Sequence, residues 1–172
     1  MKRNFLVLFL LVTAVIGGGF FFGLRYSAAS GIAGRKKEIR ANLGRIVAAL
    51  KTYSQTAGGN GLLPDDPLAV YPKFIDDPEV FVNPSWPDEI GYSYVTGVRM
   101  GAEADPPDTI LIYENVPPEK RKLGRLVAGA DGSIEQLSET QFEERLNALK
   151  SRFAEQKRTW NVLPVDPGKI LK

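Results

Sequence analysis

The sequence predicts an α+β fold, in which an N-terminal transmembrane helix and an amphipathic helix pack on a small antiparallel β-sheet, with a further helix near the C-terminus. Three observations support this prediction. Residues 5–24 contain no charged side chain, apolar residues recur at helical spacing in residues 35–56, and short apolar runs alternate with Pro, Asp and Gly in residues 62–137. The first pattern is typical of a membrane span, the second of a half-buried helix, and the third of strands joined by turns.

The uncharged run of residues 5–24 predicts a membrane anchor. Lys2 and Arg3 precede it, and no acidic residue occurs before Glu38. Roughly 20 helical residues, rising about 1.5 Å each, match the hydrocarbon core of a bilayer. We assign the anchor to Phe5, Leu8, Leu11, Val15, Phe20 and Leu24.

A second interpretation is that this run is the core of a signal peptide removed after export. Residues 27–29 read Ser-Ala-Ala, small residues that a signal peptidase accepts. The core of a cleavable signal peptide usually spans about 7 to 15 residues, so the length favours a retained anchor. We therefore expect a single-pass protein of the cytoplasmic membrane. Residues 1–34 would form the anchor and its basic flank, with the head on the periplasmic or extracytoplasmic side.

Charge and composition restrict the partners of the remaining chain. Residues 38–172 carry 16 basic and 20 acidic side chains, a net charge of −4. No nucleic-acid partner is expected, because non-specific binding to phosphates needs a basic surface. About 135 residues suffice for one hydrophobic core. The chain has no cysteine, so its stability must come from packing alone.

The first helix of the head is predicted over residues 35–56. Its apolar side chains recur every three or four residues, so they share the face that would pack on the head. They are Ile39, Leu43, Ile46, Leu50 and Tyr53. The Gly-Gly-Asn-Gly run at residues 58–61, followed by Pro64, predicts the end of this helix.

An antiparallel sheet of three or four strands is predicted next. Residues 91–96 alternate in polarity, and residues 109–113 form a β-branched and aromatic run. Residues 126–130 and 133–137 flank Asp131-Gly132, a dipeptide suited to the positive φ angles of a tight hairpin turn.

Ser138 and Gln141 form the pattern of a capping box, which predicts that the last helix begins there. Phe142, Leu146 and Leu149 recur on one face of it. The other face is interpreted as solvated surface, and it carries Glu143, Glu144, Arg145, Lys150 and Arg152. The head would then span residues 35–158, with residues 159–172 as an extended or disordered tail.

Several of these segments resemble one known family. Residues 42–53 read NLGRIVAALKTY, residues 71–84 read YPKFIDDPEVFVNP, one strand ends in Tyr113-Glu114, and residues 126–133 read LVAGADGS. In this order they resemble the type IV pilin and type II secretion pseudopilin superfamily, and within it the prepilin-like proteins of Planctomycetes and Verrucomicrobia. The resemblance spans most of residues 35–145 and implies a pilin-like fold. The residues that match or mark the family pattern are Asn42, Pro84, Glu114, Arg121, Asp131 and Gly132.

The chain also departs from that family. Its members often carry a His ten residues before the Asp-Gly pair, and this position is Arg121 here. Cysteines that are often found near Ile39 and Asn83 are absent. Residues 1–37 also lack the Gly-Phe cleavage site with a Glu at the fifth mature position. That Glu is thought to pair with a neighbouring N-terminal amine inside the filament, where an unpaired charge is costly. We therefore interpret the chain as a pseudopilin-like domain on an uncleaved anchor.

Candidates for chemistry are few. The chain has no His and no Cys, which removes the common general base, the soft metal ligands and the strongest nucleophile. The carboxylate pairs are interpreted as solvated turns because each lies beside Pro. These pairs are Asp65 with Asp66, Asp76 with Asp77, and Asp105 with Asp108. Ca²⁺ suits such loop oxygens best, but the spacing of an EF-hand is missing, so we expect neither metal nor cofactor.

The predicted function is non-enzymatic. We expect a structural or accessory component of a type II secretion or type IV pilus-like envelope assembly, with membrane lipid and other pilin-like subunits or secretion-system proteins as partners. The alternative is a secreted, soluble binding module released by signal peptidase, with a ligand groove near Trp86 and Tyr92. Against such a groove, Phe81, Trp86, Tyr92 and Tyr94 are also explained as core residues or cross-strand pairs.

Overall fold

The computed structural model describes residues 31, 33–56, 61–100 and 104–171. The chain forms two compact units, Met1–Lys37 and Glu38–Lys172. In the first unit, residues 31 and 33–37 are helical. The second unit contains the head, and the predicted anchor residues lie outside the described part of the chain.

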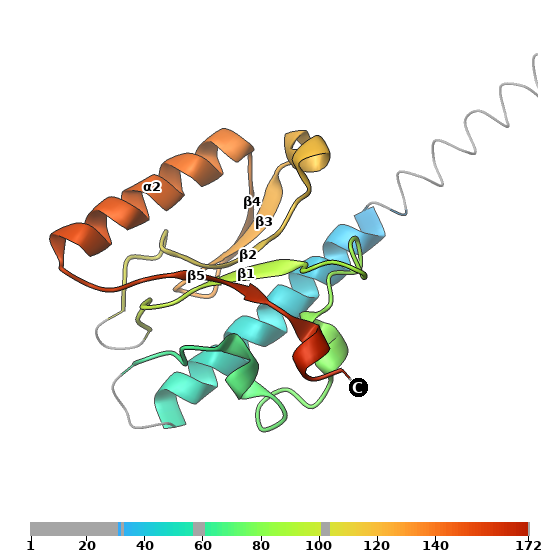
Figure 1. Cartoon of the computed structure of the whole chain (residues 1–172), viewed down its shortest axis with the longest axis horizontal. Helices are drawn as coiled ribbons and strands as arrows, with labels where there is room; N and C mark the ends of the chain where they lie inside the picture. The colour runs from blue at the N-terminus through green and yellow to red at the C-terminus, as the bar shows by residue number, and fades with distance from the viewer. Residues whose placement is uncertain (1–30, 32, 57–60, 101–103, 172) are drawn as a thin grey trace, which may run out of the picture. The chain divides into compact units, whose positions relative to one another are not determined.

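A five-stranded antiparallel sheet forms the centre of the head, in the order β4-β3-β2-β1-β5 (Figure 1). The α+β class and the antiparallel pairing are therefore confirmed. The strands are β1 Tyr92–Val95, β2 Ile110–Glu114, β3 Arg125–Gly129, β4 Ile134–Leu137 and β5 Val162–Val165.

The predicted count of three or four strands is wrong, because the C-terminal segment supplies the fifth. β5 pairs with β1, with Tyr94 opposite Leu163, and Val165 is fully buried. Of the two expectations for the tail of residues 159–172, extended or disordered, the strand at Val162–Val165 agrees with the extended one. β5 has only four residues, and Pro164 lacks an N–H donor, which an edge strand tolerates. A run this short and interrupted shows no periodicity from which a strand could be predicted.

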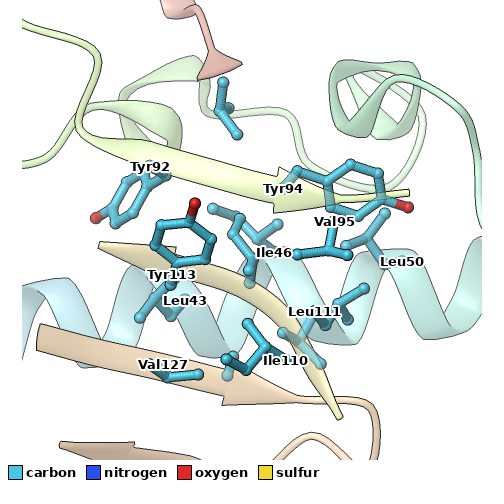
Figure 2. Packing of buried hydrophobic residues seen from close by; sticks show 14 of the residues in the cluster. Leu43, Ile46, Leu50, Tyr92, Tyr94, Val95, Ile110, Leu111, Tyr113 and Val127 are labelled. Carbon is cyan, nitrogen blue, oxygen red and sulfur yellow. The ribbon is translucent and has the colours of Figure 1, made fainter. Parts of the chain in front are cut away.

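Two helices cover the two faces of the sheet (Figure 1). Residues 38–56 form one of them, and α2 Glu139–Glu155 forms the other. On the α2 side, the rings of Tyr113 and Phe142 lie 4.8 Å apart. Figure 2 shows Leu43, Ile46 and Leu50 of the first helix behind the strands. Because the sheet lies between two helices, all residues of β1, β2 and β3 are buried.

The turns and caps follow the sequence closely. Ser138 and Gln141 form the predicted capping box at the start of α2. The Asp131-Gly132 hairpin joins β3 to β4, although only Gly132 has a positive φ, at 91°. Short 3-10 helices precede β1 (η1 Pro67–Val70 and η2 Pro78–Phe81), join β2 to β3 (η3 Pro118–Leu123) and follow β5 (η4 Pro167–Lys169).

Candidate functional site

The apolar face of helix 38–56 forms the main contact between helix and sheet. The exposed fraction of Ile39, Leu43, Ile46 and Leu50 is between 0 and 1%. Tyr53 is partly buried, and its ring meets the ring of Phe74 edge-on at 6.1 Å. The residues assigned from the sequence to helix–head packing thus lie along one continuous contact.

A buried polar cluster lies where this helix, the segment before β1 and the end of β2 meet. Its centre is Glu114, which is 5% exposed. One carboxylate oxygen of Glu114 accepts the backbone N–H of Leu126 at 3.2 Å, and the other accepts the Asn83 amide at 3.4 Å. Asn83 also donates to the carbonyl of Gly91 at 3.3 Å. The cluster joins the end of β2 to its neighbours with neutral donors.

The segment before β1 is packed too tightly for larger residues. A Cβ atom on Gly91 would lie 2.1 Å from the Cβ of Asn83. The Asn83 side chain also accepts the backbone N–H of Ser85 at 2.9 Å, which fixes the turn that contains Pro84. The Asn42 amide donates to the carbonyl of Val82 at 3.4 Å. The predicted motif residues Asn42, Pro84 and Glu114 therefore meet in one region, although sequence reasoning gave no contact between them.

Tyr92 completes this cluster opposite Glu114 on the neighbouring strand. Its side chain is fully buried, and its hydroxyl has no hydrogen-bond partner within 3.5 Å among the described residues. Burial raises the pKa of the Tyr92 phenol far above its ordinary value, while the nearby Asn42 side chain opposes that shift and the Glu114 charge adds to it. The phenol is therefore neutral at physiological pH and packs as a core residue.

The Arg121 position lies on the other side of the sheet, beside the start of α2. Its guanidinium is 4.0 Å from the Glu139 carboxylate. Glu139 also accepts hydrogen bonds from Nε and Nη2 of Arg125, whose guanidinium stacks 4.0 Å from the ring of Phe142. Arg125 is only 5% exposed. Sequence reasoning missed this residue, although an arginine at the start of the apolar strand RLVAG was a usable signal.

The Asp131-Gly132 pair lies apart from both clusters. The Asp131 carboxylate accepts the Ser133 hydroxyl at 2.7 Å and its backbone N–H at 2.9 Å. These bonds lower the pKa of Asp131, with the Ser133 hydroxyl as the main cause. Gly132 lies over the helix, since a Cβ there would be 3.7 Å from a methyl group of Val47. The pair therefore closes a hairpin that rests on helix 38–56.

The carboxylates considered for catalysis or metal binding are separated. Asp66 and Asp77 each cap a 3-10 helix by accepting the backbone N–H two residues ahead. Asp108 lies 3.7 Å from Arg152. Within the part of the chain that the structure describes, no three acidic side chains come close enough to hold a metal ion.

Asp105 differs from these solvated carboxylates because it is buried, with an exposed fraction of 8%. It accepts two bonds from the Arg158 guanidinium, at 2.6 and 2.8 Å, and the backbone N–H of Arg99 at 2.8 Å. Burial alone raises the pKa of Asp105, but the bonds from Arg158 and Arg99 and the charges of Arg158 and Arg152 outweigh it and lower the pKa. The interpretation of Asp105 as a solvated turn is therefore wrong. It fixes the segment between α2 and β5.

Two shallow hollows are lined by described residues of the head. One, of about 290 Å³, is lined by Val82, residues 87–90, residues 166–168 and Leu171. The other, of about 240 Å³, is lined by residues 122–124 and 136–138. Neither is lined by Trp86 or Tyr92, where the binding-module alternative expected a groove. Phe81, Tyr92 and Tyr94 are core residues.

In the described ranges, no helix has both the length and the apolar character needed to cross a bilayer. The predicted anchor, residues 5–24, lies outside those ranges. Comparison with family models gives no match, and neither do comparisons with curated proteins or solved structures.

Proposed function

We propose that this chain is a non-enzymatic, membrane-anchored, pseudopilin-like protein that serves as a structural or accessory component of a type II secretion or type IV pilus-like envelope assembly. The observation that carries the proposal is the contact between helix 38–56 and the sheet. Ile39, Leu43, Ile46 and Leu50 are buried along about three turns of helix. A helix packed in this way supports a head that is displayed on a stalk.

The sequence supplies the other half of the proposal. The uncharged run of residues 5–24 ends 14 residues before Glu38, so the apolar segment and the head are close neighbours along the chain. The missing Gly-Phe cleavage site and Glu favour a subunit that stays on its own anchor. Such a subunit would contact an assembly without entering an ordinary filament core.

Membrane attachment is tested first, on the full chain in its native membrane fraction. We expect the intact mass of the full chain, either with Met1 or with only Met1 removed. We also expect the protein to stay in the membrane after extraction with alkaline carbonate. A mass that begins near Ser30, in the soluble fraction, would overturn the anchor and support the secreted binding module.

The assembly role is tested by site-specific crosslinking, because the chain has no native cysteine. Ala48 is on the exposed face of helix 38–56, and Ala148 is on the exposed face of α2. We expect Ala48→Cys to crosslink to pilin-like or secretion-system proteins in native membranes, and Ala148→Cys, the matched control, to give much less product. Equal crosslinking at both positions, or none, would contradict a stalk that contacts an assembly.

A further inference from the structure

Helix 38–56 and the sheet are oriented so that one end of the head carries both the start of the helix and η3. Gly132, before β4, lies over Val47. Farther along, the Arg40 guanidinium donates to the carbonyl of Ile134 at 2.5 Å. β4 therefore runs from the middle of the helix toward its first turn.

η3 lies beside the last residue of β4, and therefore at the end of the head where helix 38–56 begins. A Cβ on Gly124 would lie 2.4 Å from the carbonyl oxygen of Leu137, so the residue that follows η3 touches the end of β4. Residues 61–64, which follow the other end of helix 38–56, lie at the opposite end of the head.

η3 presents a basic and apolar surface. Lys120, Arg121 and Lys122 are exposed in consecutive positions, and Leu123 is 48% exposed. The ammonium group of Lys120 lies 5.4 Å from the centre of the Trp86 ring. Glu119 is the only acidic residue in η3, and Gly124, at φ 69°, turns the chain directly into β3. An apolar side chain next to exposed basic side chains is the composition of surfaces that lie on anionic lipid.

The position of the predicted anchor along the chain also favours a membrane as the partner of η3. This step rests on the proposed function, in which residues 5–24 span the membrane. Leu24 and Glu38 are 14 positions apart in the chain, and even a fully extended segment of this length reaches only about 50 Å. A helical connection would be about 21 Å long. The end of the head with η3 is therefore the end at which the tether enters.

We propose that η3 rests on the anionic surface of the membrane, with Leu123 entering the headgroup layer between the flanking basic side chains. Each Lys or Arg near such a surface contributes about 1 kcal/mol. The exposed Asp88 and Glu89 lie on the segment that leads into β1, and an anionic surface repels them.

A fluorescent probe at a single cysteine tests this contact in the full chain. L123C labelled with an environment-sensitive dye is reconstituted at low density into vesicles of phosphatidylcholine, alone or with one third phosphatidylglycerol. The control is L62C, because Leu62 is 58% exposed and belongs to residues 61–64, the segment that follows the other end of helix 38–56. We expect a blue shift and brighter emission at position 123 in the anionic vesicles only. High salt should reverse this shift because it screens the attraction.

Charge variants show whether the basic side chains cause the contact. K120Q with K122Q, placed in the L123C background, should lower the ratio of bound to free heads roughly 25-fold, since each lost charge removes about 1 kcal/mol. K150Q, on the exposed face of α2, should leave the ratio unchanged.

Equal emission at positions 123 and 62, or in neutral and anionic vesicles, would overturn the contact. Reversal by millimolar inorganic phosphate would also overturn it, because the ligand would then be a soluble anion. A signal that grows with protein density would overturn it as well, because the contact would then be with a second copy of the chain. Carbonate extraction of the same samples separates the two proposals. If carbonate extracts the chain but its emission still shifts when anionic vesicles are added, the anchor is rejected and the lipid contact of η3 is retained.

Discussion

The two faces of the sheet are held by different physical interactions. On one face, helix 38–56 packs on the sheet mainly through apolar side chains, among them Leu43, Ile46 and Leu50. On the other, arginines join α2 and the segment after it to the strands and loops, as in the Arg125–Glu139 and Arg158–Asp105 pairs. The helix face depends on area removed from water, and the α2 face depends on directed charge pairs. The two should therefore respond differently to truncation, to pH and to changes in charge.

The largest effect is expected on the apolar face. Leu43→Ala removes a fully buried side chain and leaves a cavity, so it should lower the free energy of unfolding by about 3 to 4 kcal/mol. Leu62→Ala is the matched control, because the same atoms are lost from a side chain that is 58% exposed. Denaturant unfolding measures both variants. Similar losses would mean that the helix face does not carry the stability assigned to it.

On the α2 face, Arg158→Met tests a buried charge pair. The change removes both guanidinium bonds to the Asp105 carboxylate, whose side chain is 4% exposed, and among the described residues the backbone N–H of Arg99 still donates to it. We expect a loss of about 2 to 3 kcal/mol in the free energy of unfolding, because a buried charge without its partner is costly. Lys150→Met, on the exposed face of α2, is the control and should change stability by less than about 0.5 kcal/mol. A loss no larger than the control would show that Asp105 is solvated in solution.

The same pair predicts a pH dependence that the apolar face lacks. The pKa of Asp105 is lowered in the folded state, from an ordinary value of 3.8. Its contribution is therefore complete above pH 3.8 and is lost as the pH falls through the lower, folded pKa. The stability difference between the wild type and Arg158→Met should shrink in that acid range, while the difference caused by Leu43→Ala should not. Unfolding curves between neutral pH and about pH 3 decide this, and a constant difference for Arg158→Met would contradict the assignment.

The contrast between the faces also explains what could be predicted from the sequence. Apolar spacing predicted helix 38–56 and its core residues, because period alone places side chains on one face. Arg145 and Arg152 were interpreted as solvated surface for the same reason, since they fall on the polar face of α2. In the structure Arg145 pairs with Glu135, and Arg152 donates to the Thr109 hydroxyl. A helical pattern does not show which long side chains reach back to the sheet.

The candidate site residues show the same limit. Asn42, Pro84 and Glu114 lie together, whereas Arg121 and Asp131 lie in separate places. Their positions depend on strand pairing, above all on Tyr92 opposite Glu114. Local composition predicted β1 to β4 but not β5, and the pairing brings together residues that are far apart in the chain. Contacts such as Asn83 with Glu114 therefore became visible only in the fold.

Gly132 and Gly44 lie where the β3–β4 hairpin contacts helix 38–56, and alanine substitutions there should change stability in opposite directions. Gly132 has φ 91°, so Gly132→Ala should lower the free energy of unfolding by about 1 kcal/mol through backbone strain. Gly44 is helical, and a Cβ there would meet a methyl group of Ile134 at an ordinary 3.6 Å. Gly44→Ala should therefore raise stability by about 0.5 to 1 kcal/mol. Thermal unfolding of both variants gives the signs, and equal signs would contradict this account of the contact.

The smallest effect is expected from Arg145, which pairs with Glu135 on the α2 face. Their side chains are 32% and 41% exposed, far more than those of Arg158 and Asp105, so water already solvates both charges. Arg145→Ala should lower the free energy of unfolding by only about 0.5 kcal/mol, and added salt should reduce that loss. A double-mutant cycle with Glu135→Ala isolates the pair from lost packing. If its coupling energy equals that of the Arg158–Asp105 pair, burial does not set the strength of the charge pairs on this face.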